Sequence, residues 1–149
     1  MVNIEKDIWH WYHNVSECYY HIQLTIKYRK SLFKKETEDV IIETMKDFKE
    51  RYAIEINHVG FDQNHVHFLL RFLPKYSGGQ VIRLLKSISG KALFEQVSAI
   101  KKELWNAEFW TDGYYISTVS DRGSKQVIEK YIINQGRDKD VKQFRLFSL

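Results

Sequence analysis

Two neighbouring runs of alternating residues constrain the fold of this chain more than any other feature of its sequence. They are Ile54–Phe61 and His65–Phe72, and the polar trio Asp62-Gln63-Asn64 joins them. Successive side chains of a strand point to opposite faces of a sheet, and short polar connections suit tight turns. The runs therefore predict a β-hairpin whose second strand turns these residues toward a core: Val66, Phe68, Leu70 and Phe72.

The elements predicted around this hairpin give the order β-α-β-β-α-β. Strands are expected at Tyr19–Tyr28 and Tyr114–Val119, and helices at Lys35–Tyr52 and about Gln80–Phe94. In the first strand, alternation places Tyr20, Ile22, Leu24 and Ile26 on one face. This order predicts an α+β fold of the ferredoxin-like split βαβ type, an antiparallel sheet with helices on one face. A further C-terminal helix is expected at about Lys125–Gln135.

Composition sets limits on this fold but does not identify a function. The 149 residues suit one domain, 1–149, and the net charge of +4 is only weak support for a polyanionic partner. The single cysteine, Cys18, offers neither an internal disulfide nor a thiolate cluster for zinc. The first 13 residues lack the apolar run of a signal peptide. A cytoplasmic location is therefore expected.

The triplet His65-Val66-His67 is the most informative motif. Both histidines lie on the strand face opposite the apolar one, close enough to share a divalent metal ion. Such a pair also arises by chance, and it leaves a metal short of ligands, so a third donor must come from elsewhere. Histidine-triad nucleotide hydrolases need a third histidine at the position of Leu69, which excludes that class. The remaining histidines are interpreted as packing or surface residues, among them His10, His13, His21 and His58.

Tyr131 and Gln135 lie one turn apart on the predicted C-terminal helix and so share a face. A helical tyrosine is usually a core residue, but a tyrosine can also attack phosphorus and hold a covalent phosphotyrosine. A metal held by His65, His67 and the Gln135 oxygen would polarise a phosphate oxygen and orient the scissile bond. The covalent link would keep the phosphoester available for rejoining, which favours a strand transferase over a degradative nuclease.

These motifs resemble those of the single-tyrosine transposases of the HUH superfamily, the TnpA group that moves insertion sequences as single-stranded DNA. HUH denotes His-hydrophobic-His, here His65-Val66-His67, and the second signature is similar to Tyr131–Gly136. Other similar segments are Lys27-Tyr28-Arg29, Leu85–Ser89 and Phe109–Tyr115. The resemblance spans roughly Tyr19 to Gly136. One departure is Asn64, where relatives often carry an acidic residue.

The resemblance implies a transposase that cleaves single-stranded DNA with Tyr131 as the catalytic nucleophile. It implies a 5′-phosphotyrosine intermediate, a free 3′-OH, and Mg²⁺ or Mn²⁺ at the metal site. It also implies recognition of DNA hairpins near the element ends and a homodimer with joined sheets. In that dimer, Tyr131 of one subunit would work with His65 and His67 of the other.

Six basic residues are candidates for DNA phosphate contacts: Lys27, Arg29, Lys30, Arg83, Lys86 and Lys91. For any one of them a solvated basic surface is an equal alternative. Two other interpretations of the chain stay open. One is a domesticated relative with the same chemistry and a host role, and the other is a non-catalytic nucleic-acid-binding module on the same fold.

Overall fold

A computed structural model describes residues 2–5, 8–11, 13–104, 108–119 and 130 of the chain. Its main sheet has four strands in the order β5-β6-β4-β7, and all neighbouring pairs are antiparallel. The strands are β4 (Tyr19–Thr25), β5 (Ile54–Phe61), β6 (His65–Phe72) and β7 (Tyr115–Val119). The hairpin strands β5 and β6 have the predicted bounds.

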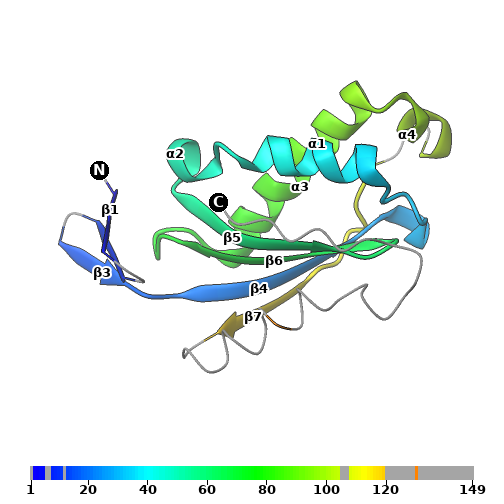
Figure 1. The fold of residues 1–149 in the computed structure, drawn as a ribbon. Coiled ribbons are helices and arrows are strands. Elements are labelled where there is room, and N and C mark those ends of the chain that lie inside the picture. The colour runs from blue at the N-terminus through cyan, green and yellow to red at the C-terminus, as the bar shows by residue number, and fades with distance from the viewer. Residues whose placement is uncertain (1, 6–7, 12, 105–107, 120–129, 131–149) are drawn as a thin grey trace.

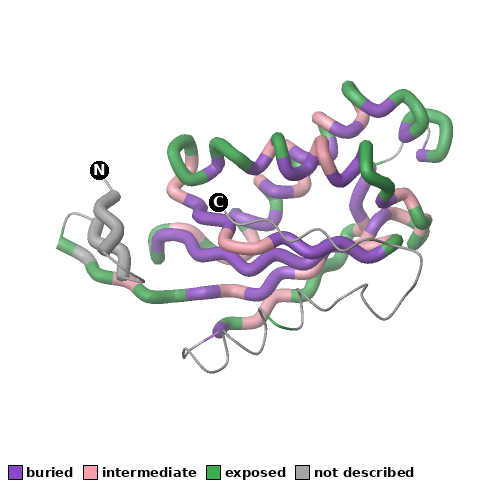
Figure 2. Tube along the Cα trace, in the orientation of Figure 1, coloured by how far each residue is buried: buried purple, intermediate pink, exposed green. Residues whose placement is uncertain are grey.

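Helices cover one face of this sheet (Figure 1). They are α1 (Lys35–Met45), α2 (Phe48–Tyr52), α3 (Gly78–Gln96) and α4 (Ser98–Glu103). The core lies between the helices and the sheet, where the buried parts of both layers meet (Figure 2). The apolar residues of β6 belong to this core, as the alternation predicts: Val66, Phe68, Leu70 and Phe72. The α+β prediction, an antiparallel sheet with helices on one face, is therefore confirmed.

The predicted helix Lys35–Tyr52 is wrong in one respect, because it is two helices. Asp47 separates α1 from α2 with φ −101° and ψ 4°, outside the helical region. Aspartate is a poor residue for a helix interior, since its carboxylate competes for local hydrogen bonds. The break still keeps Met45 and Phe48 fully buried in the core.

The first strand of the sheet ends earlier than the predicted Tyr28. Lys27–Arg29 form a short 3₁₀ turn, in which Tyr28 and Arg29 have φ of 62° and 53°. Two consecutive non-glycine residues in the left-handed region cannot continue a strand, and each costs on the order of 1 kcal/mol or more. We call Lys27–Lys30 the basic turn. Ile26, the residue before the basic turn, donates its backbone N–H to Asn64 O of the hairpin at 2.8 Å, and Lys27 donates its own to Phe109 O at 2.8 Å.

Two features were not predicted from the sequence. A second, three-stranded antiparallel sheet precedes β4, with strands β1 (Val2–Glu5), β2 (Ile8–Trp11) and β3 (Asn14–Ser16). It lies beyond the end of the main sheet (Figure 1). Helix α4 occupies the charged stretch after α3. In the described part of the chain, no helix is long and apolar enough to cross a membrane.

Candidate active site

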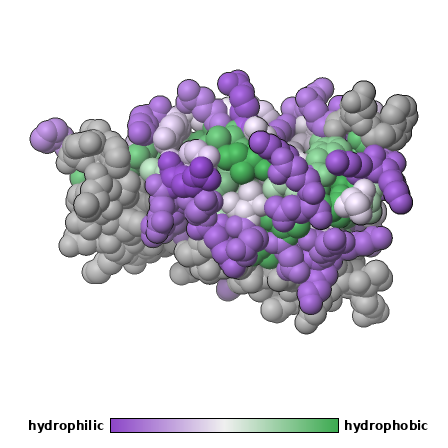
Figure 3. Space-filling model, turned by 90° about the horizontal axis from the view of Figure 1, so that it is seen from above, coloured by the Kyte–Doolittle hydropathy of each residue, from purple (hydrophilic) through white to green (hydrophobic). Residues whose placement is uncertain are grey.

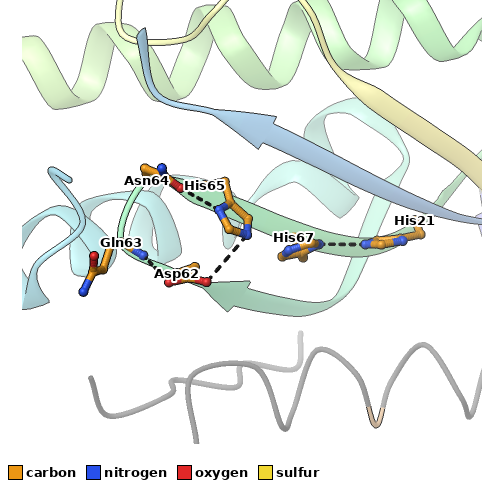
Figure 4. Close-up of polar contacts among 6 residues, drawn as sticks. All are labelled: His21, Asp62, Gln63, Asn64, His65 and His67. Carbon is orange, nitrogen blue, oxygen red and sulfur yellow. Dashed lines mark hydrogen bonds and ion pairs between the residues drawn. The ribbon is translucent and has the colours of Figure 1, made fainter. Parts of the chain in front are cut away.

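The histidine pair lies on the sheet face opposite α1 and α3, because the core residues of β6 alternate with it. The ring centroids of His65 and His67 are 4.9 Å apart, with an interplanar angle of 76°. His67 is buried, with 2% of its surface exposed, whereas the side chain of His65 is 21% exposed. The strand thus brings two imidazoles side by side at the beginning of β6 (Figure 4).

Two turn residues before β6 lie on either side of the His65 ring (Figure 4). The Asn64 side-chain oxygen lies 2.7 Å from Nδ1 of His65. Because an amide oxygen only accepts, Nδ1 of His65 carries the proton in this contact, and the unprotonated nitrogen of the neutral ring is Nε2. The buried Asp62 carboxylate lies 3.8 Å from that Nε2, and its other oxygen accepts from Gln63 N at 2.7 Å.

A third histidine contacts the pair from the neighbouring strand. His21 of β4 places Nε2 2.8 Å from Nδ1 of His67, and the two rings are nearly coplanar in orientation, 20° apart. Burial, and to a smaller extent the nearby His65 and His21, lowers the pKa of His67 to about 3. Burial also lowers the pKa of His21. Both rings are therefore neutral near pH 7, the form in which histidine binds metals.

This donor set fits a divalent metal ion as an incomplete site. Contacts occupy Nδ1 of both His65 and His67, so a shared ion would be bound through Nε2 of each ring. No group of three or more histidine, cysteine or acidic side chains within the described ranges is arranged to hold a metal. A third ligand would have to be of another type or come from another part of the chain.

The two predicted residues that would complete the site, Tyr131 and Gln135, lie outside the described residues. So does nearly all of the predicted helix Lys125–Gln135, of which only Lys130 is described; it is helical and exposed. The roles of Tyr131 and Gln135 therefore stay predictions.

The basic turn lies at the same end of the sheet as His65, which pairs with Thr25 at the end of β4. Arg29 is exposed there, whereas the Lys30 ammonium donates to Glu103, to its backbone oxygen at 2.7 Å and to its carboxylate at 3.2 Å. The charge of Lys30 is thus already paired with Glu103, whereas the Arg29 side chain is exposed to solvent.

The other predicted basic residues lie on α3, on the helical side of the molecule, whose surface is mostly hydrophilic (Figure 3). Arg83, Lys86 and Lys91 line one cavity of about 500 Å³ between α3 and the segment 108–112. The Lys86 ammonium lies 2.7–3.1 Å from three backbone oxygens of Thr111, Asp112 and Gly113. Because the basic turn hydrogen-bonds to the same segment, both predicted basic groups flank residues 108–112.

Sequence reasoning missed His21, which was interpreted as an ordinary packing or surface histidine. The signal was present, since alternation in β4 assigns Ile22 to the core and so places His21 on the opposite face. In a ferredoxin-like sheet the first and third strands are neighbours, as β4 and β6 are here. Combining the two observations would have placed His21 beside the histidine pair.

Comparisons with known proteins agree with the resemblance of the sequence motifs to transposases. The family described as "Transposase IS200 like" matches residues 14–135. The transposase for insertion sequence element IS200 of Salmonella typhimurium strain LT2 is 33% identical over 123 residues, which are 83% of this chain and 80% of that protein. The ISDra2 transposase TnpA of Deinococcus radiodurans is 29% identical over 121 residues, covering 81% of this chain and 86% of that protein.

Solved structures are similar as well. A transposase-like protein of Deinococcus radiodurans R1 superposes with a TM-score of 0.62 and 26% identity, covering 78% of this chain and 89% of that one. A REP-associated tyrosine transposase, solved bound to a REP hairpin, gives a TM-score of 0.57 at 14% identity, covering 82% and 68%. The second likeness supports the fold alone. From the family match over residues 14–135 and the IS200 relatives, this chain belongs to the IS200-like transposase family.

Proposed function

We propose that this transposase cleaves and rejoins single-stranded DNA through a covalent link to Tyr131, and so excises and inserts a mobile element. The observation that carries the proposal is the pair of imidazoles of His65 and His67, side by side on the sheet face away from the helices. A purely nucleic-acid-binding module on this fold has no need for such a pair.

The chemistry divides one strand transfer into two steps. The phenol oxygen of Tyr131 forms a bond to phosphorus while the bond from phosphorus to the 3′ oxygen breaks. The departing 3′ oxygen takes up a proton, which balances the proton lost from the phenol. The products are a 5′-phosphotyrosine and a free 3′-OH, and attack by a 3′-OH in the reverse direction joins strands.

His65, His67 and Gln135 are the residues proposed to hold Mg²⁺ or Mn²⁺. When bound there, such an ion would polarise a phosphate oxygen and orient the scissile bond. Asn64 supports this arrangement from within the chain, because it fixes the proton of His65 on Nδ1. The Asn64 amide oxygen therefore accepts the His65 hydrogen bond at a position where relatives often carry an acidic residue.

The proposed partners are single-stranded DNA with hairpins at the element ends and a second copy of this chain. The hairpin-bound tyrosine transposase of similar fold supports the first partner. In the proposed homodimer the sheets join, and Tyr131 of one subunit works with the histidines of the other. Mixing a Tyr131→Phe subunit with a His67→Ala subunit tests this sharing. If the mixture cleaves DNA and neither variant does so by itself, the active site is built from two chains.

The direct test uses end-labelled single-stranded DNA from the genomic flanks of the gene, incubated with the protein and Mg²⁺ and run on a denaturing gel. A labelled adduct of protein size is expected with single strands, and none is expected with EDTA or with duplex DNA. If the protein binds the DNA but gives neither adduct nor cleaved strand with Mg²⁺ or Mn²⁺, the proposal is wrong. The non-catalytic binding module would then account better for the chain.

The two neighbouring cations of the basic turn provide a matched prediction about DNA binding. Arg29→Gln is expected to weaken single-stranded DNA binding and to reduce the slope of log affinity against log salt by about 0.7, as for one lost phosphate contact. Lys30→Gln is expected to change the slope less, because Glu103 already pairs with that ammonium. Fluorescence anisotropy titrations at several salt concentrations measure both slopes, and equal slopes for the two variants would contradict the assignment.

A further inference from the structure

The contact between His21 and His67 constrains where the proton of each ring lies. Their facing nitrogens, Nε2 of His21 and Nδ1 of His67, are 2.8 Å apart. At this distance one nitrogen donates and the other accepts, so one of the two carries the proton. A histidine binds a metal as the neutral imidazole, which has a proton on one nitrogen only.

The two assignments have opposite consequences for metal binding. If Nε2 of His21 donates, neutral His67 must carry its own proton on Nε2, and that nitrogen has no lone pair for a metal. If Nδ1 of His67 donates, its Nε2 holds the lone pair. Because His21 already occupies Nδ1, only the second assignment allows His67 to bind a metal.

We propose that His21 is a positioning residue that accepts the Nδ1–H of His67 and thereby holds Nε2 of His67 unprotonated and oriented for the metal ion. The inference rests on the proposed function, in which His67 is a metal ligand. It extends to His67 what Asn64 does for His65, whose Nδ1–H is accepted by the amide oxygen. Acceptors for the second nitrogen of a ligating histidine are a general feature of metal sites.

Neighbouring residues hold the His21 ring in one orientation. In the register of β4 and β6, Gln23 lies directly opposite His67. His21 is therefore the diagonal neighbour of His67, close enough for the two rings to touch. Tyr115 of β7 packs edge-on against His21, with ring centroids 5.7 Å apart. His21 is buried and is thereby held between β7 and the metal-site histidine.

The first experiment reads the proton positions in the metal-free protein by ¹⁵N NMR of the histidine side chains. In the wild type, His67 is expected to show a protonated Nδ1 and an unprotonated Nε2, and His21 an unprotonated Nε2. In His21→Phe, which keeps a ring of similar shape, His67 is expected to shift toward the Nε2-protonated form. A wild-type His67 protonated on Nε2 would overturn the proposal without any variant being made.

The second experiment measures Mn²⁺ binding by calorimetry. His21→Phe is expected to lower the affinity about 10–100-fold, and His21→Gln, whose amide oxygen can accept the same hydrogen bond, is expected to restore much of it. His58→Phe is the matched control, because His58 flanks Leu69 from β5 as His21 flanks it from β4. His58→Phe should leave both readouts at His67 unchanged.

The outcomes separate this inference from the proposed function. If Mn²⁺ binds the wild type and His21→Phe equally well and the His67 proton stays on Nδ1, His21 has no positioning role. If the wild type binds no Mn²⁺, the proposed metal site fails, while the proton positions in wild type and His21→Phe still decide whether His21 orients His67. If His58→Phe changes the proton position of His67 and the Mn²⁺ affinity as much as His21→Phe does, a general disturbance of the sheet causes both changes and His21 has no specific role.

Discussion

Replacing Tyr131 with phenylalanine is expected to lower the yield of covalent protein–DNA adduct by at least about 1000-fold, while single-stranded DNA is still bound. The change removes one oxygen atom, the proposed nucleophile, and keeps the ring. Without that oxygen no phosphotyrosine can form, so neither cleavage by covalent transfer nor rejoining can follow. End-labelled DNA on a denaturing gel measures the adduct, and fluorescence anisotropy measures binding.

A second tyrosine gives the control. Tyr115 is exposed, and its ring packs against His21, which places it near the histidine pair. Tyr115→Phe is expected to retain the adduct, because the ring contact with His21 does not need the hydroxyl. If Tyr115→Phe abolishes the adduct and Tyr131→Phe does not, the nucleophile has been assigned to the wrong residue. Mass spectrometry of the digested adduct identifies the modified tyrosine independently.

Some of the fold could be predicted because its signals are local. The strands β5 and β6 have their predicted bounds, since alternation and a three-residue polar turn are both encoded within about 20 residues of sequence. Alternation in the same strand also assigned Val66 to the core and the histidines to the other face, as the structure shows.

Other parts depend on interactions that the local pattern does not contain. Apolar residues of Lys35–Tyr52 recur at helical spacing on both sides of Asp47, at Ile41, Met45, Phe48 and Tyr52, so periodicity alone could not reveal the break between α1 and α2. Alternation likewise continued through Tyr28, although the chain leaves the strand after Thr25 and hydrogen-bonds to Phe109. The strands of the N-terminal sheet have only three or four residues each, too few for a period to be recognised.

The candidate site divides in the same way. The histidine pair was found because both residues lie in one strand, whereas His21 is 46 residues away and reaches His67 only through the register of β4 with β6. A long-range contact also explains why Lys30 could not be told apart from Arg29. Its partner Glu103 lies 73 residues further along the chain.

The sheet face that carries the histidines also holds a buried ion pair, which gives the second large effect. Arg71 of β6 and Glu55 of β5 lie directly opposite in register, and the Arg71 Nε donates to the Glu55 carboxylate. Both side chains are less than a tenth exposed. Lys49 lies 3.4 Å from the other carboxylate oxygen, and the Arg71 guanidinium lies 5.2 Å from the centre of the Tyr19 ring.

Glu55→Leu is expected to lower the free energy of unfolding by about 3–5 kcal/mol, because it leaves a guanidinium buried without its carboxylate. Arginine cannot escape this cost by losing its proton. For a chain of this size the change corresponds to a fall in Tm of about 6–20 °C. Urea unfolding followed by circular dichroism measures it.

Two further variants show whether burial of the charge causes the loss. The double variant Glu55→Leu/Arg71→Met removes both charges and is expected to recover much of the stability, since an apolar pair of similar volume needs no compensating charge. Glu43→Gln breaks the exposed pair with Lys46 and is expected to cost less than about 1 kcal/mol. If the double variant is as unstable as Glu55→Leu, packing and not the unpaired guanidinium causes the loss. A stable Glu55→Leu protein would show instead that the ion pair adds little to the stability of the sheet.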